Sequence, residues 1–202
     1  SVGLGCTEPQ ARAVAVTNVP AGPVITSTGG GGTATPINVA ENGTAVTTVT
    51  STADDAAATA TYSIIGGADQ TKFTIDASTG ALSFKSAPDF ENKLDDGADN
   101  VYDVKVQVSD GSLTDTQDIA VTVTNVNEAP VITSNGGGAT ATPISVAENS
   151  TAVTTVTSTD VDASATATYS IIGGADAGKF TREGTAGGPR WASAPETKNK
   201  LD

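Results

Sequence analysis

The sequence contains no histidine and only one cysteine, Cys6. Without histidine it lacks the usual proton shuttle at neutral pH and the commonest metal-binding imidazole. A single cysteine cannot form an internal disulfide or a cluster of thiolate metal ligands. No activated nucleophile and no separate carboxylate pair replaces them, so we expect no catalytic residues, no organic cofactor and no enzyme activity.

Basic and aromatic residues are also scarce. Lys and Arg total 10 against 23 Asp and Glu, which gives a net charge of −13 and excludes nucleic acid as a partner, since phosphate binding needs a basic surface. Aromatic residues make up 4% and Met is absent, so we expect a core of Val, Ile and Ala. No apolar run approaches the roughly 18 residues of a membrane span. The given sequence does not open with the basic-then-apolar pattern of a signal peptide, so we expect Ser1 to begin a mature protein or a fragment.

An internal repeat organises the chain. VITSTGGGGTATPINVAENGTAVTTVTST begins at Val24, and VITSNGGGATATPISVAENSTAVTTVTST begins at Val131, a shift of 131 − 24 = 107 residues. About 50 of the 72 aligned positions are identical. We therefore divide the chain into the last strand of a preceding repeat (1–23), a complete repeat (24–130) and a truncated repeat without its last two strands (131–202).

Short apolar segments between turn residues predict strands. Apolar and polar residues alternate most clearly over 101–109 and 116–124. The other strands are expected at 24–27 with 37–40, 45–51, 60–65, 72–75 and 81–84. About seven short strands in about 100 residues are typical of an antiparallel sandwich. The sequence therefore predicts an all-β fold of tandem seven-stranded antiparallel Greek-key sandwiches of the immunoglobulin-like kind.

Five polar motifs follow one another along the chain. They are Ala40-Glu41-Asn42, Asp89-Phe90-Glu91-Asn92, Val108-Ser109-Asp110-Gly111, Asn125-Val126-Asn127-Glu128-Ala129-Pro130 and Asp160-Val161-Asp162. In this order they resemble the motifs of cadherin-like repeats in bacterial surface and adhesin proteins, with a linker one residue shorter than D-x-N-D-N-A-P. The resemblance covers nearly the whole chain, and it implies a cadherin-like sandwich and an extracellular or cell-surface location.

The resemblance also implies calcium binding at the junction of the two repeats. Ca²⁺ takes 6–8 oxygen ligands from carboxylates, amides and backbone carbonyls. The implied ligands are Glu41, Asp89, Glu91, Asn125, Asn127, Glu128, Asp160 and Asp162. With the ion bound, the charges are neutralised and the joint stiffens; without it, the carboxylates repel one another and the joint bends.

The other junctions depart from this pattern. At the preceding junction the first D-x-D position is Ala53, which leaves Asp54, Asp55 and Asp110 as a weaker site. In the last copy Glu148 persists, but Glu196-Thr197-Lys198 replaces the D-R-E motif, and a lysine there opposes a cation. We expect no complete site after this copy.

Two further segments, a polar loop and a strand pair of the last copy, are expected to have structural roles only. The loop Asp95–Asn100 is expected to be a solvated turn, because Asp and Asn are common in turns. In the last copy, Arg182 and Pro189 replace Ile75 and Leu82 of the complete repeat. This exchange places a charge and a strand-breaking residue at core-strand positions.

Three functions remain open. The leading one is a calcium-binding extracellular repeat that acts as a rigid spacer or adhesive segment, with like molecules or other surface and matrix components as partners. The second is a fibre subunit that polymerises head to tail by inter-chain strand donation, since 1–23 carries a final strand and 131–202 lacks one. The third, a carbohydrate-binding or enzyme-accessory sandwich, is weak because aromatic platforms are few.

Overall fold

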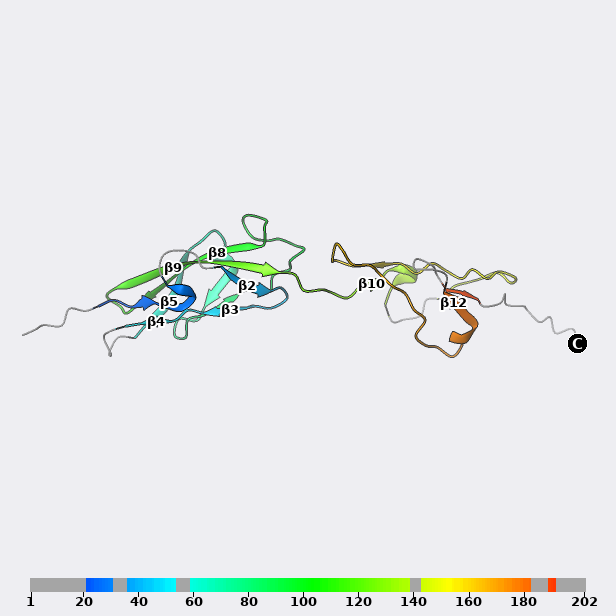
Figure 1. Ribbon diagram of the computed structural model, residues 1–202, viewed down its shortest axis with the longest axis horizontal. Helices are drawn as coiled ribbons and strands as arrows, with labels where there is room; N and C mark the ends of the chain where they lie inside the picture. Colours follow the sequence, from blue (N-terminus) through cyan, green and yellow to red (C-terminus); the bar gives the residue numbers. More distant parts are fainter. Residues whose placement is uncertain (1–20, 31–35, 54–58, 139–142, 183–188, 192–202) are drawn as a thin grey trace, which may run out of the picture. The chain divides into compact units, whose positions relative to one another are not determined.

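The computed structural model describes residues 21–30, 36–53, 59–138, 143–182 and 189–191. The chain divides into two compact units, Ser1–Thr124 and Asn125–Asp202 (Figure 1). Each unit is considered by itself. The predictions for Cys6, most of the N-terminal tail, Asp54, Asp55 and residues 196–198 fall outside the described residues.

The first unit contains a four-stranded and a three-stranded sheet. The four-stranded sheet has the order β2 (Ile37–Ala40), β9 (Thr114–Thr124), β8 (Val101–Ser109), β5 (Thr61–Gly66). The three-stranded sheet has the order β3 (Ala45–Thr48), β7 (Ala81–Phe84), β6 (Phe73–Ile75), and the short strands β1 (Val24–Ile25) and β4 (Ser51–Thr52) pair separately. These strands confirm the all-β fold predicted from the sequence.

One strand pair differs from the antiparallel rule. β2 runs parallel to β9, with Ile37 opposite Val121 and Ala40 opposite Thr124, whereas the other strand pairs of this unit are antiparallel. The first strand is split, because β1 pairs with β4 while β2 joins the edge of the other sheet. Parallel neighbours need a long connection, and here the rest of the unit provides it. The end of β2 and the end of β9 therefore lie together.

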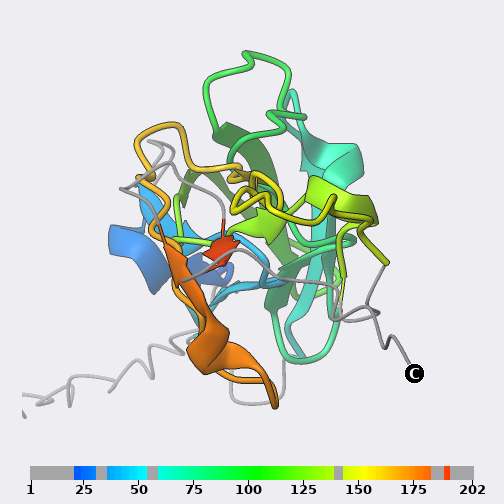
Figure 2. The ribbon, with the colours of Figure 1, turned by 90° about the vertical axis from the view of Figure 1, so that its right-hand side faces the viewer.

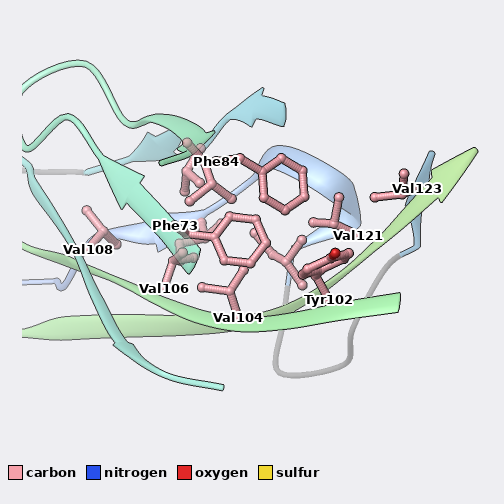
Figure 3. Close-up of a cluster of buried hydrophobic side chains, with 12 residues drawn as sticks. Phe73, Phe84, Tyr102, Val104, Val106, Val108, Val121 and Val123 are labelled. Carbon is pink, nitrogen blue, oxygen red and sulfur yellow. The ribbon is translucent and has the colours of Figure 1, made fainter. Parts of the chain in front are cut away.

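The core of the first unit lies between its two sheets. Strands β8 and β9 alternate buried and more exposed residues, as the period of two requires. The rings of Phe73 and Phe84 stack with centroids 4.6 Å apart, and Tyr102 meets Phe84 edge-on at 5.1 Å (Figure 3). The expected core of Val, Ile and Ala is therefore incomplete, because aromatic rings occupy its centre.

The second unit has few paired strands among its described residues. They are β10 (Val131–Ile132) with β11 (Ser158–Thr159), and β12 (Phe180–Arg182) with β13 (Pro189–Trp191). Residues 144–147 and 168–173, the counterparts of β2 and β5, are not strands. In the first unit these two segments pair with β9 and β8, whose counterparts are not among the 202 residues. The predicted five strands of this repeat are thus only partly formed.

The hairpin that contains Arg182 and Pro189 keeps its register. Phe180 pairs with Trp191 and Arg182 with Pro189, as Phe73 pairs with Phe84 and Ile75 with Leu82 in the first unit. The 3₁₀ turn η4 (Ala177–Lys179) leads directly into β12, and both are orange in Figure 2. Arg182 itself is exposed, so its charge stays in contact with solvent. No helix in the described residues is long and apolar enough to cross a membrane.

Candidate calcium site

Two predicted ligands, Glu41 and Glu91, come together at one end of the first unit, and a third, Asp89, lies in the same loop as Glu91. Glu41 directly follows β2, and its backbone N–H donates to the Thr124 carbonyl at 3.1 Å. The Glu41 side chain is 4% exposed, and its Oε2 accepts a hydrogen bond from the Phe90 N–H at 2.8 Å. This contact holds the glutamate beside the loop that contains Asp89 and Glu91.

The loop after β7 is closed by its own aspartate. Asp89 Oδ1 accepts hydrogen bonds from the N–H groups of Glu91 and Asn92, both at 3.0 Å. The preceding Pro88 carbonyl accepts from the Asn42 N–H at 2.9 Å. As a result, a carboxylate oxygen of Glu41 and one of Glu91 lie within 4.8 Å of each other. We call Glu41, Asp89 and Glu91 the first acidic group.

The remaining predicted ligands belong to the second unit, and Asp162 organises them. Its Oδ1 accepts from the Asn125 side-chain amide at 2.9 Å, and its Oδ2 accepts from the Glu128 N–H at 2.8 Å. Asp160 Oδ1 accepts from the Asp162 N–H at 3.1 Å, and Asn127 donates its side-chain N–H to the Glu128 carbonyl at 2.9 Å. We call these five residues the second acidic group.

The chemistry of the two groups fits a hard cation. Asn125 and Asn127 donate their amide nitrogens to protein acceptors, and the oxygen of an amide is an atom type that can bind a cation. Each carboxylate has about four lone-pair positions, so Asp89 and Asp162 can accept backbone hydrogen bonds and still bind a metal. Every atom that these side chains could offer to a metal is an oxygen, the ligand type that Ca²⁺ prefers.

The weaker predicted site lies elsewhere. Asp110 is in the turn between β8 and β9, at the end of the hairpin opposite Thr124. Its Oδ1 accepts from the N–H groups of Leu113 and Ser112, both at 2.7 Å, and these bonds lower the pKa of Asp110 below its usual value. Asp110 therefore does not join the first acidic group.

The loop Asp95–Asn100 is the predicted solvated turn only in its middle, since residues 96–99 are exposed and both ends are buried. Asp95 is 7% and Asn100 is 2% exposed. Asp95 accepts from the Asp99 N–H at 2.8 Å and the Asn100 N–H at 3.0 Å. Burial raises the pKa of Asp95, but these backbone hydrogen bonds outweigh it and leave the pKa lowered.

A second buried carboxylate lies next to this loop. Asp69, 3% exposed, accepts from the N–H groups of Asp96 and Asp103, both at 2.9 Å. Partial burial and the negative charges of Asp69, Asp99 and Asp118 raise the pKa of Asp103. No sequence motif marks this network, because its residues are scattered along the chain and only the fold brings them together.

Comparisons with known proteins agree with this fold. Residues 35–124 match the family model of the cadherin domain. The human protocadherin-24 EC1-2 crystal structure is similar, with a TM-score of 0.53 and 19% identity over 86% of this chain and 80% of that chain. For mouse cadherin-23 EC22-24 the TM-score is 0.50 and the identity 20%, over 88% of this chain and 56% of that chain. At these identities the likeness shows the fold alone. No curated protein matches the sequence.

Proposed function

We propose that this chain is part of an extracellular adhesion protein, in which calcium at the junction of its two repeats stiffens an otherwise flexible joint. The match of residues 35–124 to the cadherin domain supports an adhesion-type module. The ion would be held by the first acidic group together with the second. It would supply positive charge that neutralises the ligands and ties them to one centre.

The main support is the close approach of two carboxylates. Glu41 and Glu91 bring carboxylate oxygens within 4.8 Å, although two negative charges at this distance repel. The hydrogen bond from Phe90 to Glu41 and the turn closed by Asp89 hold both residues in this position. A divalent cation converts this repulsion into attraction, which favours calcium binding over a purely structural role.

Two adjacent residues connect the two acidic groups along the chain. Thr124 is bonded through its carbonyl to the backbone of Glu41, and the next residue, Asn125, is bonded through its side chain to Asp162. Consecutive Cα atoms are about 3.8 Å apart. This one-bond tether supports a shared ion whatever angle the two units adopt without it.

Calcium titration followed by thermal unfolding tests the proposal. A ligand that binds only the folded protein raises the melting temperature in a concentration-dependent way. Extracellular calcium modules bind at about 10⁻⁴–10⁻³ M, so the rise should develop over that range. Magnesium is the control, because it prefers few carboxylates and strict octahedral geometry and should stabilise much less. A melting temperature that is unchanged at 10 mM calcium would contradict calcium binding.

The mechanical part of the proposal needs a separate measurement. Small-angle X-ray scattering with and without calcium reports the spread of angles between the two units. On calcium addition we expect the molecules in solution to show a narrower range of maximum dimensions. If calcium raises the melting temperature but leaves the scattering curve unchanged, the protein binds calcium without using it to stiffen the joint.

A further inference from the structure

We infer that Asn100 is a positioning residue for calcium, acting through the loop that holds Glu41 and Glu91; the inference rests on the proposed function. Asn100 is 2% exposed and lies in the left-handed region at φ 67. It belongs to the Asp95–Asn100 loop and to none of the five motifs that mark the calcium ligands. Its role follows from the hydrogen bonds that surround it.

These hydrogen bonds close a ring around Glu41. The Glu41 side chain accepts from the Phe90 N–H at 2.8 Å, and the Phe90 carbonyl accepts from Asn100 Nδ2 at 2.9 Å. The Asn100 carbonyl accepts from the Val123 N–H at 2.9 Å. The next residue, Thr124, accepts through its carbonyl from the Glu41 N–H at 3.1 Å. Asn100 thus links the ligand loop to the end of β9, where Glu41 is anchored.

The side chain of Asn100 is specific to this task. Its Oδ1 is buried and has no hydrogen-bond partner among the described residues. A buried polar atom without a partner lowers stability, so folding stability alone does not favour asparagine here. Glycine would adopt the same left-handed conformation without this cost. The Nδ2 donor to Phe90 is the feature that asparagine adds.

The far side of Asn100 is fixed as well. Its backbone N–H donates to Asp95 Oδ1 at 3.0 Å, and the other oxygen of Asp95 accepts from the Asp99 N–H at 2.8 Å. Asp95 itself is buried, so both ends of this loop are anchored to the sandwich. The donor that Asn100 offers to Phe90 is therefore fixed before any ion arrives.

This arrangement affects calcium affinity because it orders the ligands in advance. Phe90 lies between the ligands Asp89 and Glu91, and both its N–H and its carbonyl are used in the ring. If the carbonyl contact is lost, the loop must be ordered when the ion binds, and the ordering cost reduces affinity. Outer partners of metal ligands typically change metal affinity by about 10–100-fold.

Two variants isolate the Nδ2 donor. Asn100→Gly keeps the left-handed backbone and removes the side chain. Asn100→Asp keeps size and backbone preference and replaces the donor by an oxygen, so it serves if the glycine variant does not fold. We expect calcium affinity, measured by isothermal titration calorimetry, to fall about tenfold or more in either variant. We also expect faster hydrogen exchange of the Phe90 amide in the calcium-free protein.

Gln117→Leu is the matched control for a purely structural effect. Gln117 is also fully buried, and its Nε2 donates to the Ser27 carbonyl at 3.2 Å, toward the other end of β9. Whatever the effect on stability, its loss should leave calcium affinity and Phe90 exchange as in the wild type. An Asn100 variant that folds and binds calcium like the wild type overturns the inference. If the wild type binds no calcium, the proposed function fails, and the inference about Asn100 fails with it.

Discussion

Replacing Glu41 by glutamine should reverse the order of stability of mutant and wild type when calcium is added. Glu41→Gln keeps the shape of the side chain. It also keeps an oxygen that can accept a hydrogen bond from the Phe90 N–H, which in the wild type lies 2.8 Å from Oε2. A hydrogen bond to a charged acceptor is worth roughly 1 kcal/mol more than one to a neutral acceptor, so the variant loses about that much. The same change removes the repulsion between Glu41 and Glu91.

The repulsion follows from the distance between the two carboxylates. Unit charges at 4.8 Å interact by about 1 kcal/mol in bulk water and by about 3.5 kcal/mol at an effective dielectric constant of 20. The gain therefore equals or exceeds the loss of the charged hydrogen bond. Without calcium, the variant should be as stable as the wild type, or more stable by up to about 2 kcal/mol.

Calcium should reverse this order, because under the proposed function only the wild type has the full set of ligands. At a calcium concentration of about 100 times the dissociation constant, binding adds about 2.7 kcal/mol to the wild type. Urea unfolding followed by circular dichroism measures the difference in unfolding free energy between variant and wild type. It is done once in a calcium chelator and once in calcium. Glu148→Gln is the control, because Glu148 is the same motif residue in the second unit and should leave the calcium response unchanged.

Two outcomes would refute the reasoning about Glu41. If Glu41→Gln is stabilised by calcium as much as the wild type, Glu41 is not a ligand. If the variant is less stable than the wild type by more than about 2 kcal/mol in chelator, its carboxylate stabilises the fold more than it repels Glu91.

Four further substitutions test separate parts of the structure. Asp162→Asn should weaken calcium binding about tenfold or more in calorimetry, because it removes one ligand charge; an unchanged affinity would exclude Asp162. Gly80→Ala should lower the unfolding free energy by at least about 2 kcal/mol, because its φ is +72 and a Cβ would lie 2.1 Å from the Val49 carbonyl oxygen. Gly111→Ala, with φ +94 and no atom within 4 Å, should cost only about 1 kcal/mol in the same urea titration. Asp103→Asn should stabilise the protein at pH 7 by less than about 1 kcal/mol, since its charge still meets solvent. The folded pKa of Asp103 is raised, so its charged form opposes folding above that pKa, and the gain should vanish at pH 3.

The strands were predictable wherever local pattern and long-range pairing agree. Alternating apolar residues over 101–109 correspond to β8, whose Val104, Val106 and Val108 are buried. The aromatic centre of the core was not predictable from composition. Phe73, Phe84 and Tyr102 come from three strands, and only the packing of the two sheets brings their rings together.

The repeat shows how much of a strand depends on its neighbours. TYSIIG is β5 at Thr61–Gly66, where it pairs with β8, but the same six residues at 168–173 are not a strand. Ile25 is 1% exposed in the first unit and its counterpart Ile132 is 51% exposed. Local propensity is the same in both copies, so the difference comes from the hydrogen bonds and the cover that β8 and β9 provide. A sequence pattern therefore predicts which face is apolar and cannot by itself predict whether that face is covered.

The same distinction explains which part of the candidate site could be predicted. Ligand motifs are local: Asp89 and Glu91 are two residues apart, and Asp89 closes its own turn. Asn100 acts on Phe90 from ten residues away and on Val123 from the end of another strand, so no motif contains all three. The short polar loop that contains Asn100 has the composition of a solvated turn. Only the burial of Asp95 and Asn100 distinguishes a structural role of these residues from a solvated one. Under the proposed function, calcium affinity would depend on two layers of residues, of which the sequence motifs include only the inner one.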